Sequence, residues 1–244
     1  MEDDRAPRIR LGMITPSSNT VLEPMCAAML TGLPDVTAHF GRLRVTRIAL
    51  DRGSAEQFDT APMQEAASLL TDARVHSLCW NGTSASWLGL GQDEAVCAAL
   101  TERTGVKATS ASLATVELLR RAGVTRFGLV TPYTEDVQAS IVATYAGLGF
   151  TCVGERHAGI AENYAFAHLD EAGLTAMVRD VAAAGPRAIS ILCTNLRGAA
   201  IAATLEAELG VLMLDSTACA LWGSLRAAGV APLRVSGWGS LFGL

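Results

Sequence analysis

Ile189-Ser-Ile-Leu-Cys193-Thr-Asn-Leu-Arg-Gly198 is the stretch around which the chain is organised. An apolar run of strand length ends in a cysteine and hydrogen-bonding residues, and a helix-patterned segment, Ala199 to Leu209, follows. This order predicts a buried strand, a loop and a helix. In open α/β sheets ligands bind at that junction, so Cys193 is a candidate functional residue. Buried free cysteine is also a common structural residue, and this stretch alone leaves both roles open.

The chemistry of Cys193 depends on the pKa of its thiol. A thiol at a strand end can act as a nucleophile or as an acid once that pKa is tuned. We expect the backbone amides of Thr194 and Asn195 at a helix start, where they would favour the thiolate. A lowered pKa at Cys193 would therefore indicate an enzyme, whereas an inert thiol with intact ligand binding would indicate a binding protein.

The strand and loop pattern occurs twice along the chain. Phe127-Gly-Leu-Val-Thr-Pro132-Tyr133 matches Leu11-Gly-Met-Ile-Thr-Pro16-Ser17, residues 189–198 match 77–89, and 105–124 match 210–230. A repeat near half the chain length predicts two copies of one α/β unit, each a doubly wound parallel sheet. We expect two pseudosymmetric, Rossmann-like halves, with residues 1–110 plus 215–244 in the first and 111–214 in the second. The active site would lie in the cleft between them, with Cys193 opposite Gly82.

Strand and helix patterns alternate through the first half. Strands are expected at 8–14, 36–44, 75–80 and 106–109, and helices from about 20 to 31, 54 to 74, 93 to 103 and 114 to 122. Ser18, Asn19 or Thr20 is expected to cap the first helix. This order supports the α/β class.

Composition narrows the class of protein. The chain has 244 residues, 19 basic and 24 acidic, with no basic stripe, so nucleic acid is not an expected partner. Its apolar runs are too short for a membrane span, and its acidic N-terminus lacks a signal-peptide layout, so we expect a cytoplasmic protein with reduced thiols. The six cysteines form no CxxC pair and no histidine approaches them at ligand spacing, so we expect no metal site.

The loops at the strand ends offer neutral hydrogen-bond donors. They are 16–20, 82–86, 132–134 and 193–195, and they contain no lysine or histidine. Preorganised neutral donors suit a carboxylate or an oxyanion, and Tyr133 adds a phenolic proton. We therefore expect a small mono- or dicarboxylate substrate. For any one serine or threonine, a helix-capping role stays open.

Five motifs recur together at these strand ends: Thr15-Pro-Ser-Ser-Asn19-Thr, Gly82-Thr-Ser, Thr131-Pro-Tyr133, Asn163 and Ser190-Ile-Leu-Cys193-Thr-Asn-Leu-Arg. In this combination the chain, from about residue 8 to residue 229, resembles the aspartate/glutamate racemase superfamily. The resemblance is to its maleate cis-trans isomerase and arylmalonate decarboxylase branch. It implies two pseudosymmetric α/β halves and chemistry without a cofactor.

What the resemblance implies for mechanism depends on two cysteines, one from each half. Racemases use the pair as opposed acid and base, and the isomerase uses the first as a nucleophile and the second as a proton donor. This sequence has Gly82 in the first position, and Cys79 would face elsewhere by strand alternation. Gly82 followed by Thr83 and Ser84 resembles the decarboxylase type. There such donors hold one carboxylate, the other leaves as carbon dioxide, and one cysteine protonates the enediolate.

Two carboxamides favour a different substrate. Asn19 and Asn163 match the isomerase type, and they would solvate a second carboxylate where decarboxylation calls for an apolar pocket. We interpret the chain as a decarboxylase of a malonate-like dicarboxylate. The alternatives are an isomerase-like or racemase-like enzyme on a small dicarboxylate, and a non-catalytic carboxylate-binding protein. A homo-oligomer is compatible with either, and the roles of Asp215, Arg44 and Arg197 stay open. The expected catalytic residue is Cys193, and the expected substrate-binding residues are Pro16, Ser17, Asn19, Gly82, Thr83, Ser84, Tyr133, Asn163, Thr194 and Asn195.

Overall fold

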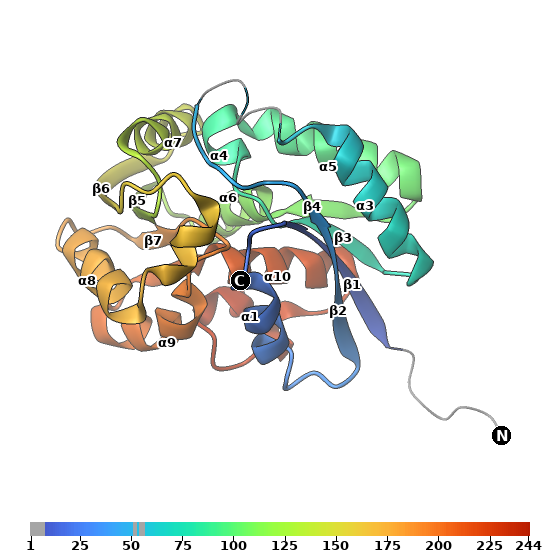
Figure 1. Cartoon of the computed structure of the whole chain (residues 1–244). Helices are drawn as coiled ribbons and strands as arrows, with labels where there is room; N and C mark the ends of the chain where they lie inside the picture. Colours follow the sequence, from blue (N-terminus) through green and yellow to red (C-terminus); the bar gives the residue numbers. More distant parts are fainter. Residues whose placement is uncertain (1–7, 51–52, 54–56) are drawn as a thin grey trace.

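Two four-stranded parallel sheets form the centre of the molecule (Figure 1). The computed structural model describes residues 8–50, 53 and 57–244. The strand order is β2-β1-β3-β4 in the first sheet and β6-β5-β7-β8 in the second, so the second sheet repeats the first strand by strand. The predicted α/β fold is therefore confirmed. The strands are β1 (Ile9–Pro16), β2 (Val36–Leu43), β3 (Ser77–Trp80), β4 (Ala108–Ser110), β5 (Arg126–Thr131), β6 (Thr151–His157), β7 (Ala188–Ile191) and β8 (Leu212–Asp215).

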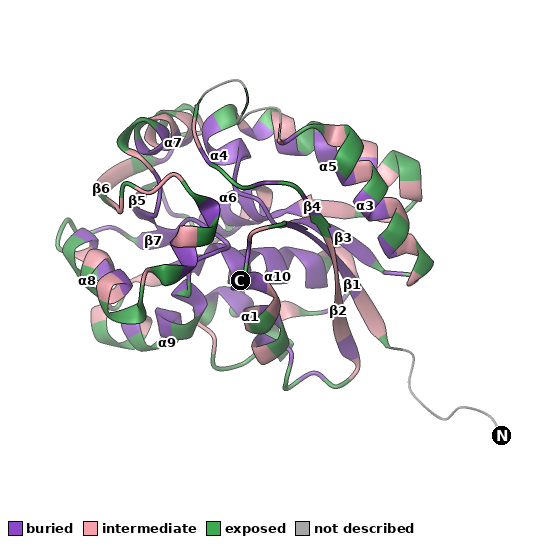
Figure 2. Cartoon of the chain, viewed as in Figure 1, coloured by how far each residue is buried: buried purple, intermediate pink, exposed green. Residues whose placement is uncertain are grey.

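Helices cover the sheets, and their buried sides face the sheets (Figure 2). The C-terminal helix α10 packs on β3 and β4 of the first sheet and also on α6. The helices are α1 (Leu22–Met29), α3 (Thr60–Asp72), α4 (Ala85–Leu88), α5 (Leu90–Thr104), α6 (Ala111–Arg121), α7 (Glu135–Gly147), α8 (Glu171–Ala182), α9 (Gly198–Leu209), α10 (Ser216–Ala227) and the short 3-10 helices η1 (Asn163–His168), η2 (Pro232–Arg234) and η3 (Ser240–Gly243).

The central strands are buried on both faces, as expected for parallel strands between helix layers. Every residue of β3 and of β7 is buried. The edge strand β6, in contrast, is partly exposed along its whole length and contains Glu155, Arg156 and His157. Such a polar strand lacks the apolar run that marks β3 and β7 in the sequence, which is why sequence patterning did not single it out.

Two predicted helices begin three residues earlier in the structure, and the start of a third is not described. The helices expected at 93 and 114 begin at Leu90 and Ala111. Ser110 sets the start of α6, because its Oγ accepts a hydrogen bond of 3.1 Å from the backbone N–H of Leu113. The predicted start at residue 54 lies outside the described residues, and α3 begins at Thr60.

A short antiparallel bridge joins the two halves beyond the strand ends. The backbone N–H of Ile48 donates to the carbonyl of Ala161 at 2.9 Å, and that of Asn163 donates to the carbonyl of Thr46 at 2.9 Å. These segments follow β2 and β6, which hold equivalent places in the two sheets. The bridge therefore ties the halves together on the side where the loops after the strands lie.

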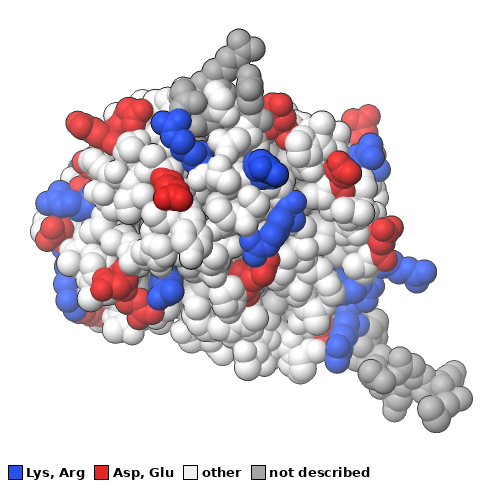
Figure 3. All heavy atoms as spheres, in the orientation of Figure 1, with Lys and Arg blue, Asp and Glu red and all other residues white. Residues whose placement is uncertain are grey.

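Charged side chains of both signs are interspersed on the face shown in Figure 3. Among the residues that the structure describes, no helix is long and apolar enough to cross a membrane.

Candidate active site

The loops after β3 and β7 meet at a small cavity between the two halves. Its lining includes these predicted site residues: Pro16, Gly82, Thr83, Tyr133, Asn163, Cys193 and Thr194. The topology explains why these two loops meet, because β3 and β7 hold equivalent inner places in their sheets and both end in short polar loops. Residues more than 170 positions apart in the sequence, Pro16 and Cys193, thus line one space.

The cavity measures about 20 Å³. That volume holds about one water molecule, whereas small-molecule sites have volumes of several hundred Å³. A carboxylate substrate therefore requires the wall to move. Part of this wall is the segment that contains Val45 and Ile48, which the cross-half bridge holds in place through the N–H of Ile48.

Each strand-end threonine makes a hydrogen bond to the other half. Thr83 Oγ1 after β3 lies 2.7 Å from the hydroxyl of Tyr133, in the loop after β5. Thr194 Oγ1 after β7 accepts a hydrogen bond of 3.1 Å from Asn19 Nδ2, in the loop after β1, and donates one of 2.8 Å to the carbonyl of Asn81. The two contacts are pseudosymmetric, and they fix the strand ends relative to each other.

Cys193 is buried, and its sulfur lies against a backbone amide and a phenol. The N–H of Asn195 donates to Sγ at 3.3 Å. Burial raises the pKa of Cys193 to about 12, and the hydrogen bonds from Asn195 and Tyr133 oppose that rise only in part. The pKa of Cys193 is therefore not lowered, so this sign of an enzyme is not met, and the case for a catalytic Cys193 depends on its position at the cavity. The amides of Thr194 and Asn195 also precede α9, which begins at Gly198.

A raised pKa changes what Cys193 can do. Near neutral pH the thiol keeps its proton, which disfavours a resting thiolate nucleophile and suits a proton donor. The same direction of shift occurs at other buried cysteines, such as Cys79, whose pKa burial raises to about 12. What distinguishes Cys193 is its position: all six cysteines are described and free, and it is the one that lines the cavity.

The remaining predicted residues do not line the cavity. Ser17 is exposed, and its Oγ accepts from the N–H of Val45 at 3.3 Å. Asn19 Oδ1 accepts from the N–H of Val21, directly before α1, and from the N–H of Leu22, its first residue, both at 2.9 Å. The N-cap position of α1 is Val21, and among the three candidates Asn19 is the one whose side chain binds N–H groups at the start of this helix.

Asn195 and Ser84 are also buried beside the cavity without lining it. The Asn195 side chain accepts from the N–H of Thr20 at 3.0 Å and donates to the carbonyl of Asn163 at 2.6 Å, so it joins three segments. Ser84 Oγ has no hydrogen-bond partner among the described residues. Asn163, which does line the cavity, donates from Nδ2 to Ser18 Oγ at 2.7 Å.

An apolar wall completes the cavity, and sequence analysis missed most of it. The wall consists of Val45, Ile48, Phe58 and Trp87. Edge-to-face contacts link Phe58 to Trp87 (ring centroids 6.1 Å apart) and Trp87 to Tyr133 (5.2 Å). These residues come from the connection after β2 and from α4, and no local pattern marks them.

Three polar residues whose roles the sequence left open, Asp215, Arg44 and Arg197, lie outside the cavity lining. Asp215 is fully buried at the end of β8, and its Oδ1 accepts from the N–H groups of Thr217 and Ala218 at 2.9 and 3.0 Å. It caps α10, and burial raises its pKa to about 7. Arg44 and Arg197 are exposed and do not line the cavity.

Cys79, as strand alternation predicts, points away from the cavity. Its Sγ lies 3.9 Å from the carbonyl of Ala220 in α10.

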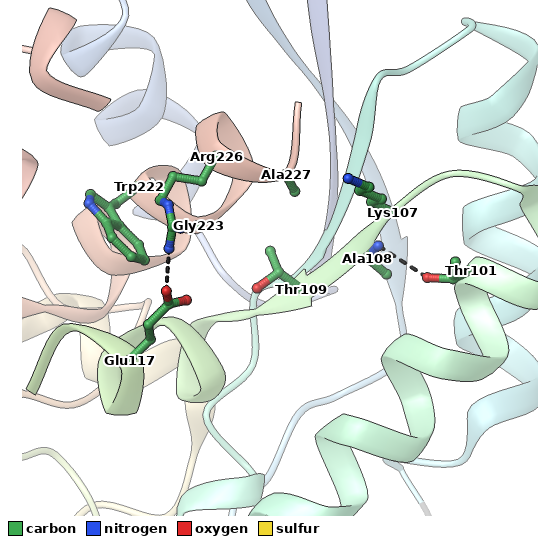
Figure 4. Close-up of a pocket in the computed structure, with 9 residues that line it drawn as sticks. All are labelled: Thr101, Lys107, Ala108, Thr109, Glu117, Trp222, Gly223, Arg226 and Ala227. Atoms are coloured by element: carbon green, nitrogen blue, oxygen red, sulfur yellow. Dashed lines mark hydrogen bonds and ion pairs between the residues drawn. The ribbon is translucent and has the colours of Figure 1, made fainter. Parts of the chain in front are cut away.

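A larger hollow of about 350 Å³ lies elsewhere, between β4, α6 and α10 (Figure 4). Its charged groups include Lys107 and an ion pair between Glu117 and Arg226. It contains no thiol and none of the strand-end loops, so it offers no chemistry comparable to that around Cys193. Among the described residues, no cluster of His, Cys, Asp and Glu has a geometry that could hold a metal ion.

Comparisons with known proteins relate the chain to two kinds of enzyme. A family model described as arylmalonate decarboxylase matches residues 11–242. An arylmalonate decarboxylase of Bordetella bronchiseptica is 30% identical over 235 residues, which cover 95% of each chain. A maleate isomerase of Pseudomonas putida is 26% identical and covers 95% of this chain and 96% of its own.

Solved structures of both enzymes share the fold. A Nocardia farcinica maleate cis-trans isomerase variant with a covalently bound succinylcysteine intermediate superposes with a TM-score of 0.87 at 24% identity, over 96% of this chain and 98% of that one. A liganded arylmalonate decarboxylase variant superposes with a TM-score of 0.84 at 26% identity, over 96% and 98%.

Proposed function

The chain belongs to the arylmalonate decarboxylase family, and from that premise we propose that it is a cofactor-independent decarboxylase of a malonate-like dicarboxylate. In this proposal Cys193 is the proton donor. Carbon–carbon bond cleavage releases carbon dioxide and leaves its electron pair on the substrate as an enediolate. The thiol of Cys193 then transfers its proton to the α-carbon, and the resulting thiolate regains a proton from water.

The observation that carries the proposal is an asymmetry of the cavity. The loop after β7 contributes one protonated thiol, and the loop after β3 contributes no ionisable side chain. Burial keeps the proton on Cys193, since it raises the thiol pKa to about 12. The equivalent position after β3 is Gly82, followed by Thr83. A single acid can complete a decarboxylation, whereas acid–base exchange on both faces of a carbon needs two ionisable groups.

The two sides of the cavity suit the two carboxylates of such a substrate. The hydroxyls of Thr83 and Tyr133, 2.7 Å apart, offer neutral donors for the retained carboxylate and for the enediolate. The wall of Val45, Ile48 and Phe58 offers the leaving carboxylate no hydrogen bond. Loss of hydration there raises the energy of that carboxylate relative to carbon dioxide, which is neutral.

A second candidate function is isomerisation of a small unsaturated dicarboxylate, and Asn163 is the observation that favours it. Its side chain lines the cavity and could solvate a second carboxylate. Against it, the Nδ2 of Asn163 already donates to Ser18 Oγ at 2.7 Å, and position 82 offers no nucleophile. A binding protein without turnover would use the same donors, and only a reaction assay separates it from the enzyme.

Proton NMR in deuterated water tests the proposal. The purified protein is incubated with phenylmalonate, methylmalonate, maleate and aspartate in separate samples. We expect loss of carbon dioxide from a malonate, with one deuteron placed on one face of the α-carbon. Cys193→Ala should lower that rate by about 10³-fold or more, because it removes the general acid.

Cys79→Ala is the matched control, since Cys79 is equally buried but its thiol points to α10. This variant should decarboxylate within about twofold of the natural chain. Fumarate formed from maleate, with no decarboxylation, would support the isomerase instead. Ligand binding without any turnover would support the binding protein.

A further inference from the structure

Trp80 and Gly82 compete for the same space beside the cavity. A Cβ built on Gly82 would lie 2.1 Å from Trp80 Cζ2 and 2.4 Å from Cε2. Carbon atoms that are not bonded approach to about 3.5 Å at best, so the indole ring and any side chain at position 82 exclude each other. The contact is with the rigid ring, which has no flexible end that could yield.

The backbone of Gly82 does not itself require glycine. Gly82 is absent from the glycines with positive φ, so an L-residue can adopt its conformation without strain. The three atoms nearest to a Cβ at position 82 all belong to the ring of Trp80, so this ring is what requires the glycine. This differs from glycines such as Gly105 and Gly210, whose positive φ fixes the residue type.

The second half shows the opposite arrangement at the equivalent positions. Strand β3 ends at Trp80 and β7 ends at Ile191, and two residues later come Gly82 and Cys193. Where the strand ends in the smaller Ile191, the loop carries a thiol that lines the cavity. Where the strand ends in the large Trp80, the equivalent position of the loop, Gly82, has no side chain.

Packing fixes the ring of Trp80 in this place. The side chain is fully buried, and its ring contacts Phe58 edge to face with centroids 6.3 Å apart. Phe58 in turn lines the cavity. The indole Nε1 has no acceptor among the described residues, so no hydrogen bond holds the ring.

We propose that Trp80 is a specificity-determining residue that excludes an acid–base side chain from the face of the cavity opposite Cys193. Its indole occupies the place where a side chain at position 82 would begin. Proton transfer is thereby limited to the single face that Cys193 reaches. The steric part of this inference is independent of the reaction, and the part about proton transfer rests on the proposed decarboxylation.

Thermal unfolding of four proteins tests the steric part: the natural chain, Gly82→Cys, Trp80→Leu and the double variant. We expect Gly82→Cys alone to lower Tm by roughly 5 °C or more, because it overpacks the core. In the Trp80→Leu background, the same change should cost little or raise Tm, because the thiol fills the space that the ring leaves. Trp80→Met serves as the second background, since Met also lacks the ring and adapts to irregular gaps.

Two alanine variants separate overpacking from a general intolerance of side chains. Gly82→Ala adds only the clashing Cβ and should also lower Tm. Gly91→Ala is the matched control, because a Cβ there meets no atom within 4 Å, and it should leave Tm unchanged or raise it. The inference is overturned if Gly82→Cys is as stable as the natural chain, or if it costs the same Tm with Trp80 and without it.

Racemisation of the monoacid product in deuterated water tests the consequence for chemistry. A single thiol can exchange the α-proton with retention, whereas inversion needs one group to remove the proton from one face and a second group to deliver a deuteron to the opposite face. We expect the double variant to racemise the monoacid at least tenfold faster than either single variant. Equal rates in all three would refute this part. If the natural chain decarboxylates nothing, the proposed function fails, while the Tm comparison still decides the role of Trp80.

Discussion

The ends of β3 and β7 are equivalent in topology but have different chemistry, and the difference shows how one fold builds an asymmetric site. Both strands are inner strands of four-stranded parallel sheets, and both are followed by a threonine that hydrogen-bonds to the other half. The shared Thr83 and Thr194 hold the two ends together. Other residues give the two strand ends different chemistry. The β7 end contributes the thiol of Cys193, and the β3 end contributes Gly82 beside the ring of Trp80.

The outer strands β4 and β8 also end in residues that share a role but differ in type. Ser110 ends β4 and Asp215 ends β8, and each side chain caps the helix that follows its strand. The serine cap is neutral, whereas the aspartate cap is a fully buried carboxyl group. We therefore expect the Asp215 cap to make the free energy of unfolding depend on pH, whereas the Ser110 cap should not.

The largest expected effect is this pH dependence of the free energy of unfolding. Burial raises the pKa of Asp215 to about 7 from an ordinary value near 4, so between these values the folded state holds a proton that the unfolded state has lost. Stability therefore falls as pH rises from about 4 to about 7, by an amount of the order of 3 kcal/mol. Urea denaturation at pH 4.5, 6 and 7.5 measures this change.

Asp215→Ser converts the second cap to the residue type of the first and should remove its share of the slope. Asp93 has the same direction of shift, because burial raises its pKa to about 7, so the fall in stability should disappear only in Asp215→Ser combined with Asp93→Asn. His39, whose pKa burial lowers, contributes a rise in stability with pH that all these variants keep. A slope that is unchanged in Asp215→Ser would mean that the two caps do not differ in this way.

The next effect concerns the cross-half contact on the β3 side. Tyr133→Phe removes the hydroxyl that contacts Thr83 Oγ1 at 2.7 Å and that hydrogen-bonds to Cys193. We expect turnover to fall by about 10–100-fold, because a neutral donor to the developing charge is lost. The pKa of the Cys193 thiol should rise further, since the Tyr133 hydrogen bond is one of the interactions that lower it.

Tyr145→Phe is the matched control for this prediction. Tyr145 is also fully buried, and its hydroxyl lies 3.4 Å from Ser86 Oγ, but it does not line the cavity. Its loss should leave kcat within about twofold while it lowers stability modestly. Equal losses of turnover in the two variants would show that the Tyr133 hydroxyl supports folding and not the reaction.

Sequence patterns were sufficient for the sheets and for the loops that carry the polar site residues. The repeat that aligns Cys193 with Gly82 depends on local apolar runs and turn residues, and these fix where strands end. Since parallel strands present their carboxyl ends on one edge, the meeting of Gly82 and Cys193 followed from topology.

Two features of the site could not be predicted from local patterns. The apolar wall of Val45, Ile48 and Phe58 comes from a long connection that folds back over the strand ends, and its position depends on the cross-half bridge. The pKa of Cys193 depends on how completely the thiol is buried, which is a property of the assembled halves. Hydrogen-bond donors near the sulfur are visible in the sequence, but the loss of hydration that outweighs them is not.

The smallest effect concerns the cross-half contact on the β7 side, in which Thr194 lines the cavity and Asn19 does not. Asn19 has two separate tasks: Oδ1 accepts from the N–H groups of Val21 and Leu22, and Nδ2 donates to Thr194 Oγ1 at 3.1 Å. Asn19→Ala removes both and should lower the free energy of unfolding by about 2 kcal/mol. Asn19→Ser keeps a capping oxygen and loses only the cross-half bond, so it should cost about 1 kcal/mol.

The difference between these two variants separates helix capping from attachment of the halves, and urea denaturation resolves it. Asp170→Ala is the control for capping alone, because its Oδ1 accepts from the N–H of Gly173 at 2.7 Å within the second half. Turnover in Asn19→Ser should stay within about threefold, since Asn19 does not line the cavity. A loss of turnover as large as that of Tyr133→Phe would mean that the β7-side contact belongs to the site as much as the β3-side contact does. The asymmetry between the two strand ends would then lie in Cys193, Gly82 and Trp80 alone.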